Sequence, residues 1–439
     1  MSDDHNDILA FPDGFLWGTA TSAHQVEGGN QNNDWWAWEQ SPGHISDGSH
    51  CGLACDGWHR AEEDLATAAQ LGQNSHRLSL EWSRLEPREG AWDEGAVARY
   101  RQILSAMRAL GLEPMVTLFH FTLPLWLYER GGWENEHTVT CFSRFVERVV
   151  DAFGDLCSFW CTINEPTLYV AFGYVTGVWP PGRGGPGAAR AAFRHLARAH
   201  AEVYALIHRR QPGARVGYAH HLRPFDPASP RRWLDRAGAA LLDHLLNESA
   251  LAAYEDGALL FPFGWELRRR SRERLSDYIG LNYYGRDLVA FDPQRSAEMY
   301  LHRFADAHSD YSMDGWGEIY PQGLYRSLKR VGASGLPVYV TEFGIPDNDD
   351  SKRPRFIVSH LAAMHRAIRE GVDVRGAYWW SLVDNFEWAA GWSARFGLLR
   401  LDPATQERTP NPSAAVYARI ARANGLERSL IRELAPDLL

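Results

Sequence analysis

The chain has 439 residues, 45% of them hydrophobic and 23% charged, and a formal net charge of −10 at pH 7. This composition is close to that of an average soluble globular protein and excludes global disorder or a disulfide-stabilised miniprotein. Because the net charge is negative and no basic block occurs, nucleic acids and anionic membranes are not expected as partners.

Eight short segments rich in apolar, β-branched or aromatic residues are typical of buried strands. In chain order they are 15–21, 74–82, 113–120, 159–166, 214–221, 277–284, 337–344 and 375–382. Between most of them lie Ala-, Leu-, Arg- and Glu-rich stretches with helical periodicity. Two of these stretches end in glycine, a common helix stop.

The alternation of eight strands with helices predicts an α/β protein, a (β/α)8 TIM barrel. A doubly wound open sheet is the alternative, but no G-x-G-x-x-G follows the first strand. No linker divides the chain, so we expect one catalytic domain over 1–439, with residues 1–10 flexible. Long loops follow several strands, and loops on one rim of a barrel are where a site is built. They span 27–56, 172–186, 224–230, 286–317 and 386–402.

Two glutamates stand at predicted strand ends, where barrel enzymes carry their catalytic groups. Glu165, in Thr-Ile-Asn-Glu-Pro, ends the fourth strand, and Glu342, in Val-Thr-Glu-Phe-Gly, ends the seventh. In an eight-stranded barrel these ends face one cavity from opposite sides. Such a pair can cleave a glycosidic bond, since one carboxyl protonates the leaving oxygen and the other attacks the anomeric carbon or activates water. For either glutamate alone, a salt-bridged or helix-capping carboxylate is the simpler interpretation.

Several longer phrases occur in one order along the whole chain. They are FPDGFLWGTATSAHQVEG, HRLSLEWSRLEP, TLFH-x-x-LP, TINEP, DYIGLNYYG, VTE-x-G and WSLVDNFEWAAGWSARFGL. With them the chain resembles glycoside hydrolase family 1, the retaining β-glucosidases and β-galactosidases. LEWSRLEP, LPLWL and the stretch from RPRFIVSHLAAMHRAI to DVRGAYWWSLVDNFEW are most similar to the archaeal-type branch.

The resemblance implies a role for each matching residue. Glu165 would be the acid/base and Glu342 the nucleophile, supported by Arg77, Tyr284 and Asn282. The substrate would be bound by Gln25, His120, Asn164 and Glu387, over an apolar floor formed by Trp380. Trp388, Phe396, His221 and Trp316 would complete the substrate-binding set. Without the resemblance, Arg77 is equally well a structural ion-pair partner, His120 a core histidine and the tryptophans core residues.

The sequence departs from the family pattern at four places. Phe121 replaces the usual tryptophan after His120, which removes an indole donor, and Phe343-Gly344 replaces Asn-Gly after the nucleophile. His221 stands where strand five usually ends in a small amide. Trp316 is one place earlier than the usual aglycone-side tryptophan. None of these changes removes a catalytic group, and together they indicate an altered pocket.

The predicted function is hydrolysis of β-glucosides and related β-galactosides and β-fucosides by double displacement, with transglycosylation when an alcohol or sugar outcompetes water. The substrates are small molecules, no cofactor or metal is needed because the carboxylates carry both steps, and a homo-oligomer is compatible with the chain. The Glu387-Trp388 pair argues against phosphorylated sugars. The alternatives are a non-catalytic sugar-binding protein on the same scaffold and an endo-acting barrel glycosidase.

The N-terminal sequence MSDDHNDILAF is acidic and has neither the basic start nor the apolar stretch of a secretory signal. No apolar run reaches about 18 residues, the length that a spanning helix needs. The cysteine spacings do not match a structural zinc site, so free thiols in a reducing cytoplasm are the simplest expectation. The five cysteines are Cys51, Cys55, Cys141, Cys157 and Cys161.

Overall fold

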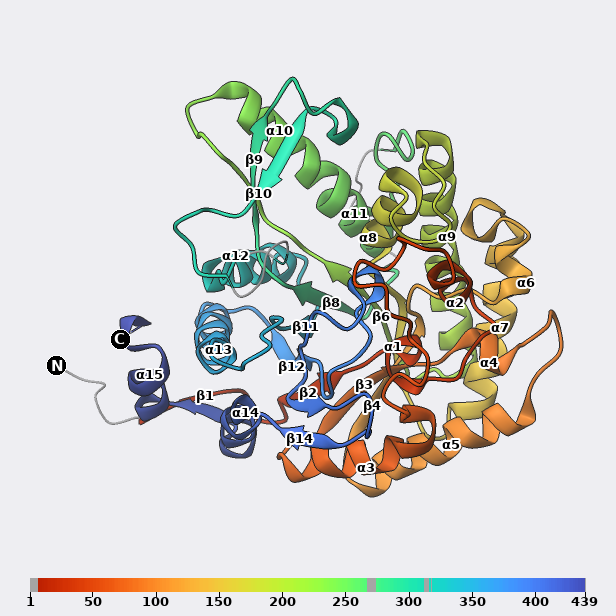
Figure 1. Ribbon diagram of the computed structural model, residues 1–439, viewed down its shortest axis with the longest axis horizontal. Helices are drawn as coiled ribbons and strands as arrows, with labels where there is room; N and C mark the ends of the chain where they lie inside the picture. Colours follow the sequence, from red (N-terminus) through yellow and green to blue (C-terminus); the bar gives the residue numbers. More distant parts are fainter. Residues whose placement is uncertain (1–6, 267–273, 312–315, 317, 439) are drawn as a thin grey trace.

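The computed structural model describes residues 7–266, 274–311, 316 and 318–438. At its centre, eight parallel strands form a closed barrel (Figure 1). They are β2 (Leu16–Ala20), β3 (Ser75–Ser79), β4 (Glu113–Phe119), β5 (Phe159–Asn164), β6 (Arg215–His221), β8 (Tyr278–Tyr283), β11 (Val338–Phe343) and β12 (Val374–Trp380). All eight predicted strands are therefore confirmed, and the closed barrel rules out the open doubly wound sheet.

Helices surround the barrel and cover the outer faces of its strands (Figure 1). The longer ones are α3 (Gly57–Gln70), α5 (Glu94–Ala109), α7 (His137–Phe153), α9 (Pro186–Arg210), α10 (Trp233–Asp243), α11 (Ser249–Asp256), α12 (Pro321–Gly332), α13 (Arg353–Arg369) and α14 (Pro412–Ala423). In α7, Phe142, Val146, Val149 and Phe153 are buried at helical spacing. This apolar stripe explains why the segment forms a helix that packs inward.

Shorter elements are inserted around the barrel. The helices are α1 (Ala23–Glu27), α2 (Asp34–Glu39), α4 (Trp82–Leu85), α6 (Leu125–Tyr128), α8 (Pro166–Val170) and α15 (Arg428–Leu434). The strands form a three-stranded sheet and two two-stranded sheets: β10 (Leu301–Phe304), β9 (Asp287–Phe291) and β7 (Phe225–Pro227); β13 (Leu399–Leu401) and β14 (Arg408–Pro410); β1 (Ile8–Ala10) and β15 (Gly425–Glu427). The β9–β10 hairpin and α10 lie together at the upper edge of Figure 1.

The two ends of the described chain meet, because β1 pairs antiparallel with β15. The expectation that residues 1–10 are flexible therefore does not hold for Ile8–Ala10, whose backbone groups pair with Gly425–Glu427. Residues 1–6 lie outside the described residues.

Aromatic side chains fill the half of the barrel interior where the strands begin. Phe159, Tyr278 and Tyr339 are buried, and their ring centroids lie 4.9–5.3 Å apart. These residues stand at or near the first positions of their strands, so they block the end of the barrel where the strands begin. The remaining space opens at the carboxyl ends of the strands, as in other barrels.

All five cysteines carry free, buried thiols. This agrees with the expectation from their spacing. Within the described ranges, no helix is both long enough and apolar enough to cross a bilayer.

Replacing Gly217 by alanine tests the packing of the aromatic layer. A Cβ atom at Gly217 would lie 2.6 Å from the carbonyl oxygen of Tyr278 and 2.7 Å from its ring. Because overpacking a rigid interior destabilises the folded state, we expect Gly217→Ala to lower the apparent melting temperature by roughly 3–8 °C. Gly213→Ala is the control, since a Cβ there meets no atom within 4 Å. Equal melting temperatures for the two variants would contradict this packing.

Candidate active site

A cavity of about 510 Å³ opens where the barrel strands end. Ten of the fourteen predicted site residues line it, among them Glu165 and Glu342. The remaining four lie directly behind the lining and contact it: Gln25, Arg77, Asn282 and Phe396. The structure therefore brings the whole predicted set together around one cavity.

Glu342 is buried between a cation and a phenol. The Arg77 guanidinium donates to Glu342 Oε1, and the Tyr284 hydroxyl donates to Oε2 at 2.7 Å. Burial raises the pKa of Glu342 to about 7, and the nearby Glu165 adds to this effect, while Arg77 and Tyr284 lower the pKa. The two donors thus favour the ionised form, as predicted, but desolvation outweighs them in the unliganded protein.

Glu165 stands at the junction of β5 and α8, and its backbone adopts a left-handed conformation with φ of 43°. Such a conformation is strained for a residue with a Cβ atom, and strain of this kind gathers at functional sites. Its Oε1 accepts a hydrogen bond from Asn282 Nδ2 at 2.8 Å and lies 3.2 Å from His221 Nδ1. Phe121 and Trp388, which line the same cavity, also have positive φ angles, 73° and 49°.

The position of Asn282 corrects one prediction. Asn282 is predicted to support Glu342, but its amide donates to Glu165. Asn282 pairs with Glu342 in the β8–β11 register, and Thr341 fixes the amide by donating to its oxygen at 2.7 Å. This leaves the amide nitrogen directed at the residue across the cavity.

Asn164 connects the surroundings of the two glutamates. Its Oδ1 accepts from Arg77 at 2.6 Å and from Asn282 at 3.1 Å, and its Nδ2 lies 3.1 Å from His120 Nε2. Burial lowers the pKa of His120 well below its usual value, so the imidazole is neutral and has one ring nitrogen as an acceptor. The partners of both glutamates therefore belong to one hydrogen-bonded network.

A third buried carboxyl, Glu387, lines the same cavity. Gln25 Nε2 donates to it at 3.1 Å and the Trp380 indole at 3.4 Å. Burial raises the pKa of Glu387 to about 8. The Trp380 ring is stacked against His120 with centroids 5.9 Å apart. A sugar has an apolar face and several hydroxyls. The Trp380 ring can pack against the apolar face, and the neighbouring donors and acceptors can bind the hydroxyls.

Sequence reasoning missed a second group of lining residues. Arg223, Asp287 and Arg303 line the cavity, as do Leu168, Phe172 and Val178. Most fall in or beside the loops 172–186, 224–230 and 286–317, which the sequence analysis singled out as rim loops. The position of these loops after predicted strands indicates that they lie at the rim. Nothing in the sequence indicates which of their side chains turn toward the cavity.

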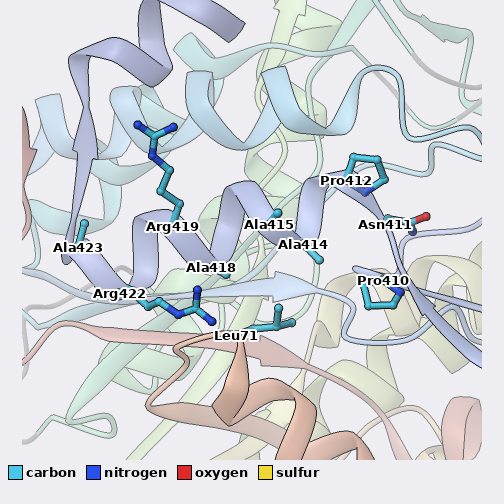
Figure 2. Close-up of a pocket in the computed structure, with 10 residues that line it drawn as sticks. All are labelled: Leu71, Pro410, Asn411, Pro412, Ala414, Ala415, Ala418, Arg419, Arg422 and Ala423. Carbon is cyan, nitrogen blue, oxygen red and sulfur yellow. The ribbon is translucent and has the colours of Figure 1, made fainter.

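A second depression in the described surface lies away from the barrel cavity. An open groove of about 800 Å³ runs along α14, with Leu71 beside it (Figure 2). None of the described residues that line it carries a carboxylate, so it lacks the chemistry of the barrel cavity.

Glu89, His137 and Cys141 place three possible metal ligands within 4.8 Å of one another. Arg130 pairs with the Glu89 carboxylate, and Arg144 lies 3.8 Å from it. Burial raises the pKa of the Cys141 thiol to about 11. Since a metal needs the thiolate and is repelled by two cations, this cluster does not fit a metal centre at neutral pH.

A closed barrel with two buried carboxyls lining one cavity is the arrangement that barrel glycoside hydrolases use. The family model described as glycosyl hydrolase family 1 matches residues 8–426. The chain belongs to this family and is a glycoside hydrolase.

Named relatives support this assignment. The chain is 32% identical to β-glucosidase A of Thermotoga maritima over 96% of this chain and 99% of the relative. It is 31% identical to a β-galactosidase of Pyrococcus woesei over 97% of this chain and 99% of the relative.

Solved structures show the same fold. A β-glycosidase from Pyrococcus horikoshii superimposes with a TM-score of 0.89 at 36% identity, covering 97% of this chain and 98% of that one. The Thermotoga maritima β-glucosidase in complex with castanospermine gives 0.88 at 30% identity, covering 95% and 99%. Bacterial and archaeal β-glycosidases thus both resemble this chain over nearly its full length.

Removing the Tyr284 hydroxyl tests the electrostatics around Glu342. A hydrogen bond to the carboxylate favours its ionised form, so Tyr284→Phe should raise the pKa of Glu342 by about one unit. The acid limb of kcat/KM, which reports the free enzyme, should move from near pH 7 to higher pH by that amount. An acid limb that stays in place would show that Tyr284 does not stabilise this anion.

Proposed function

We propose that this glycoside hydrolase removes terminal β-glucosyl and related β-glycosyl residues, such as β-galactosyl and β-fucosyl, by retaining double displacement. Glu342 is the nucleophile and Glu165 the acid/base. The observation that carries the proposal is that both carboxyls line one cavity while each has its own set of partners. The roles differ because the Arg77 guanidinium contacts Glu342, whereas Glu165 contacts the Asn282 amide and the His221 imidazole.

In the first step, Glu342 attacks the anomeric carbon as a carboxylate. The bond from that carbon to the aglycone oxygen breaks, and Glu165 gives its proton to this oxygen, so a neutral alcohol leaves. The product is a covalent glycosyl ester on Glu342. Because Arg77 and Tyr284 each donate to a Glu342 oxygen, they hold the carboxylate in place before the attack.

In the second step, Glu165 acts as a base. It takes a proton from water, the resulting nucleophile attacks the anomeric carbon from the face that the aglycone left, and Glu342 departs as a carboxylate. The two inversions give overall retention. An alcohol or sugar in place of water gives transglycosylation by the same bond changes.

The glycone occupies the inner part of the cavity in this proposal. Gln25, His120, Asn164 and Glu387 take its hydroxyls, and Trp380 lies beneath the ring. Glu387 accepts from the hydroxyls at carbons four and six, and one acceptor can reach either epimer at carbon four. The proposal therefore includes both gluco and galacto substrates.

Azide rescue tests the two catalytic roles. Glu342→Ala should lose hydrolysis of an aryl β-glucoside by several orders of magnitude. Azide should then restore release of the aryl group and give the α-glycosyl azide, because a single displacement inverts the anomeric centre. Glu165→Ala with azide should instead give the β-glycosyl azide, which NMR distinguishes. An α-azide from Glu165→Ala would reverse the assignment.

A substrate panel tests the glycone. We expect 4-nitrophenyl β-glucoside and β-galactoside to have kcat/KM values within about tenfold of each other, the effect of one neutral hydrogen bond. The glucoside 6-phosphate should react at least about 100-fold more slowly, because its phosphate would be buried beside the Glu387 carboxyl, while the two lining arginines, Arg223 and Arg303, lie nearer to the cavity mouth. A preference for the phosphorylated substrate would contradict this pocket assignment.

Residues 1–439 form one catalytic domain, which the family match over 8–426 supports. The buried thiols support a cytoplasmic location.

An assay with a soluble aryl glycoside and a polymeric β-glucan separates this exo-acting enzyme from an endo-acting one. Binding of the glycoside without release of the aryl group at any pH would instead favour a sugar-binding protein.

A further inference from the structure

The outer part of the cavity differs in charge from its inner part. Glu165 and Glu342 have side chains that are 5% and 4% exposed, whereas those of Arg223 and Arg303 are 18% and 42% exposed. All four residues line the same cavity. The carboxyls therefore lie at its depth, and two guanidinium groups lie nearer to its mouth.

One carboxylate is shared between these two arginines. Asp287 Oδ1 accepts from Arg223 Nη2 at 2.7 Å, while Asp287 Oδ2 is 3.9 Å from Arg303 Nη1. Arg223 is fixed further by Asn247, whose amide donates to the Arg223 carbonyl at 2.9 Å. One acid cannot neutralise two guanidinium groups, so this part of the described lining carries excess positive charge. Arg303, the more exposed of the two, is the less firmly paired.

Another wall of the cavity is apolar. α8 and the segment Ala171–Thr176 contribute Leu168 and Phe172, and Val178 follows with half of its surface exposed. An aglycone that fits both walls has a flat apolar body and an anionic group. A guanidinium recognises a carboxylate with two parallel hydrogen bonds, which gives direction as well as attraction.

We propose that Arg223 and Arg303 form an anion-accepting aglycone subsite, selecting β-glycosides whose aglycone is an aromatic acid. This inference rests on the proposed function, because the aglycone must leave from Glu165 toward the cavity mouth. The anion belongs to the aglycone and not to the sugar, since the proposed glycone position lies beside the buried Glu387 carboxyl, whereas both lining arginines are more exposed.

The test compares 4-carboxyphenyl β-D-glucoside with its neutral isostere, 4-carbamoylphenyl β-D-glucoside. Binding is measured by calorimetry at pH 7 in the Glu342→Gln background, so that chemistry does not enter the result. We expect the acid to bind about tenfold more tightly than the amide, and Arg303→Gln to abolish this preference. Raising the salt concentration should reduce it, as expected for a half-exposed pair.

Arg295→Gln is the matched control. Arg295 lies in the same chain excursion and its side chain is 41% exposed, but it pairs with Asp292 and Glu298 and is not among the cavity residues. The preference for the acid should persist in this variant. Equal affinities for acid and amide, or a preference that survives Arg303→Gln, would overturn the proposal.

Turnover by the protein with Glu342 intact separates this inference from the proposed function. Hydrolysis of both glucosides without a preference in binding would remove the anionic subsite and leave the glycosidase in place. Failure to hydrolyse either one, in a protein that binds both, would instead remove the proposed function.

Discussion

The buried ion pair between Arg77 and Glu342 is the interaction on which the rest of the site depends. Both side chains are nearly inaccessible, and a buried guanidinium without its anion typically costs about 3–5 kcal/mol of stability. The barrel meets this requirement by surrounding Arg77 with acceptors from three other strands: Thr117 on β4, Asn164 on β5 and Glu342 on β11. The orientation of Glu342 is therefore fixed by folding itself, before any substrate arrives.

The register between neighbouring strands extends this hydrogen-bonded arrangement across the cavity. Asn282 pairs with Glu342 in the sheet, yet its amide reaches Glu165 and shares the Asn164 oxygen with Arg77. The aromatic layer below closes the other end of the barrel, so these polar groups share one desolvated space. Because these side chains are almost inaccessible to solvent, each of their hydrogen bonds counts for more than one on the surface.

Much of this arrangement could be predicted from the sequence. Strands buried on both faces give continuous apolar runs, so all eight were found, and the catalytic glutamates stand at the ends of two of them. The contact of Asn282 with Glu165 could not be predicted, because a side chain's direction depends on the neighbouring strand's register. Arg223 and Arg303 were missed for a related reason. They come from separate rim excursions, which only the folded chain brings to one wall.

The buried cavity disfavours several ionised carboxylates at once, because each negative charge raises the pKa of the neighbouring carboxyls. Burial raises the pKa of Glu342 to about 7 and that of Glu387 to about 8, and each further charge in the cavity raises them more. Arg77 is the buried cation that contacts one of these carboxyls, and that carboxyl is Glu342. Arg77 therefore favours the ionised form of the group that must attack. Because burial raises the pKa of Glu387 to about 8, its protonated carboxyl can donate to a sugar hydroxyl as well as accept from one, which gives the glycone end both a donor and an acceptor.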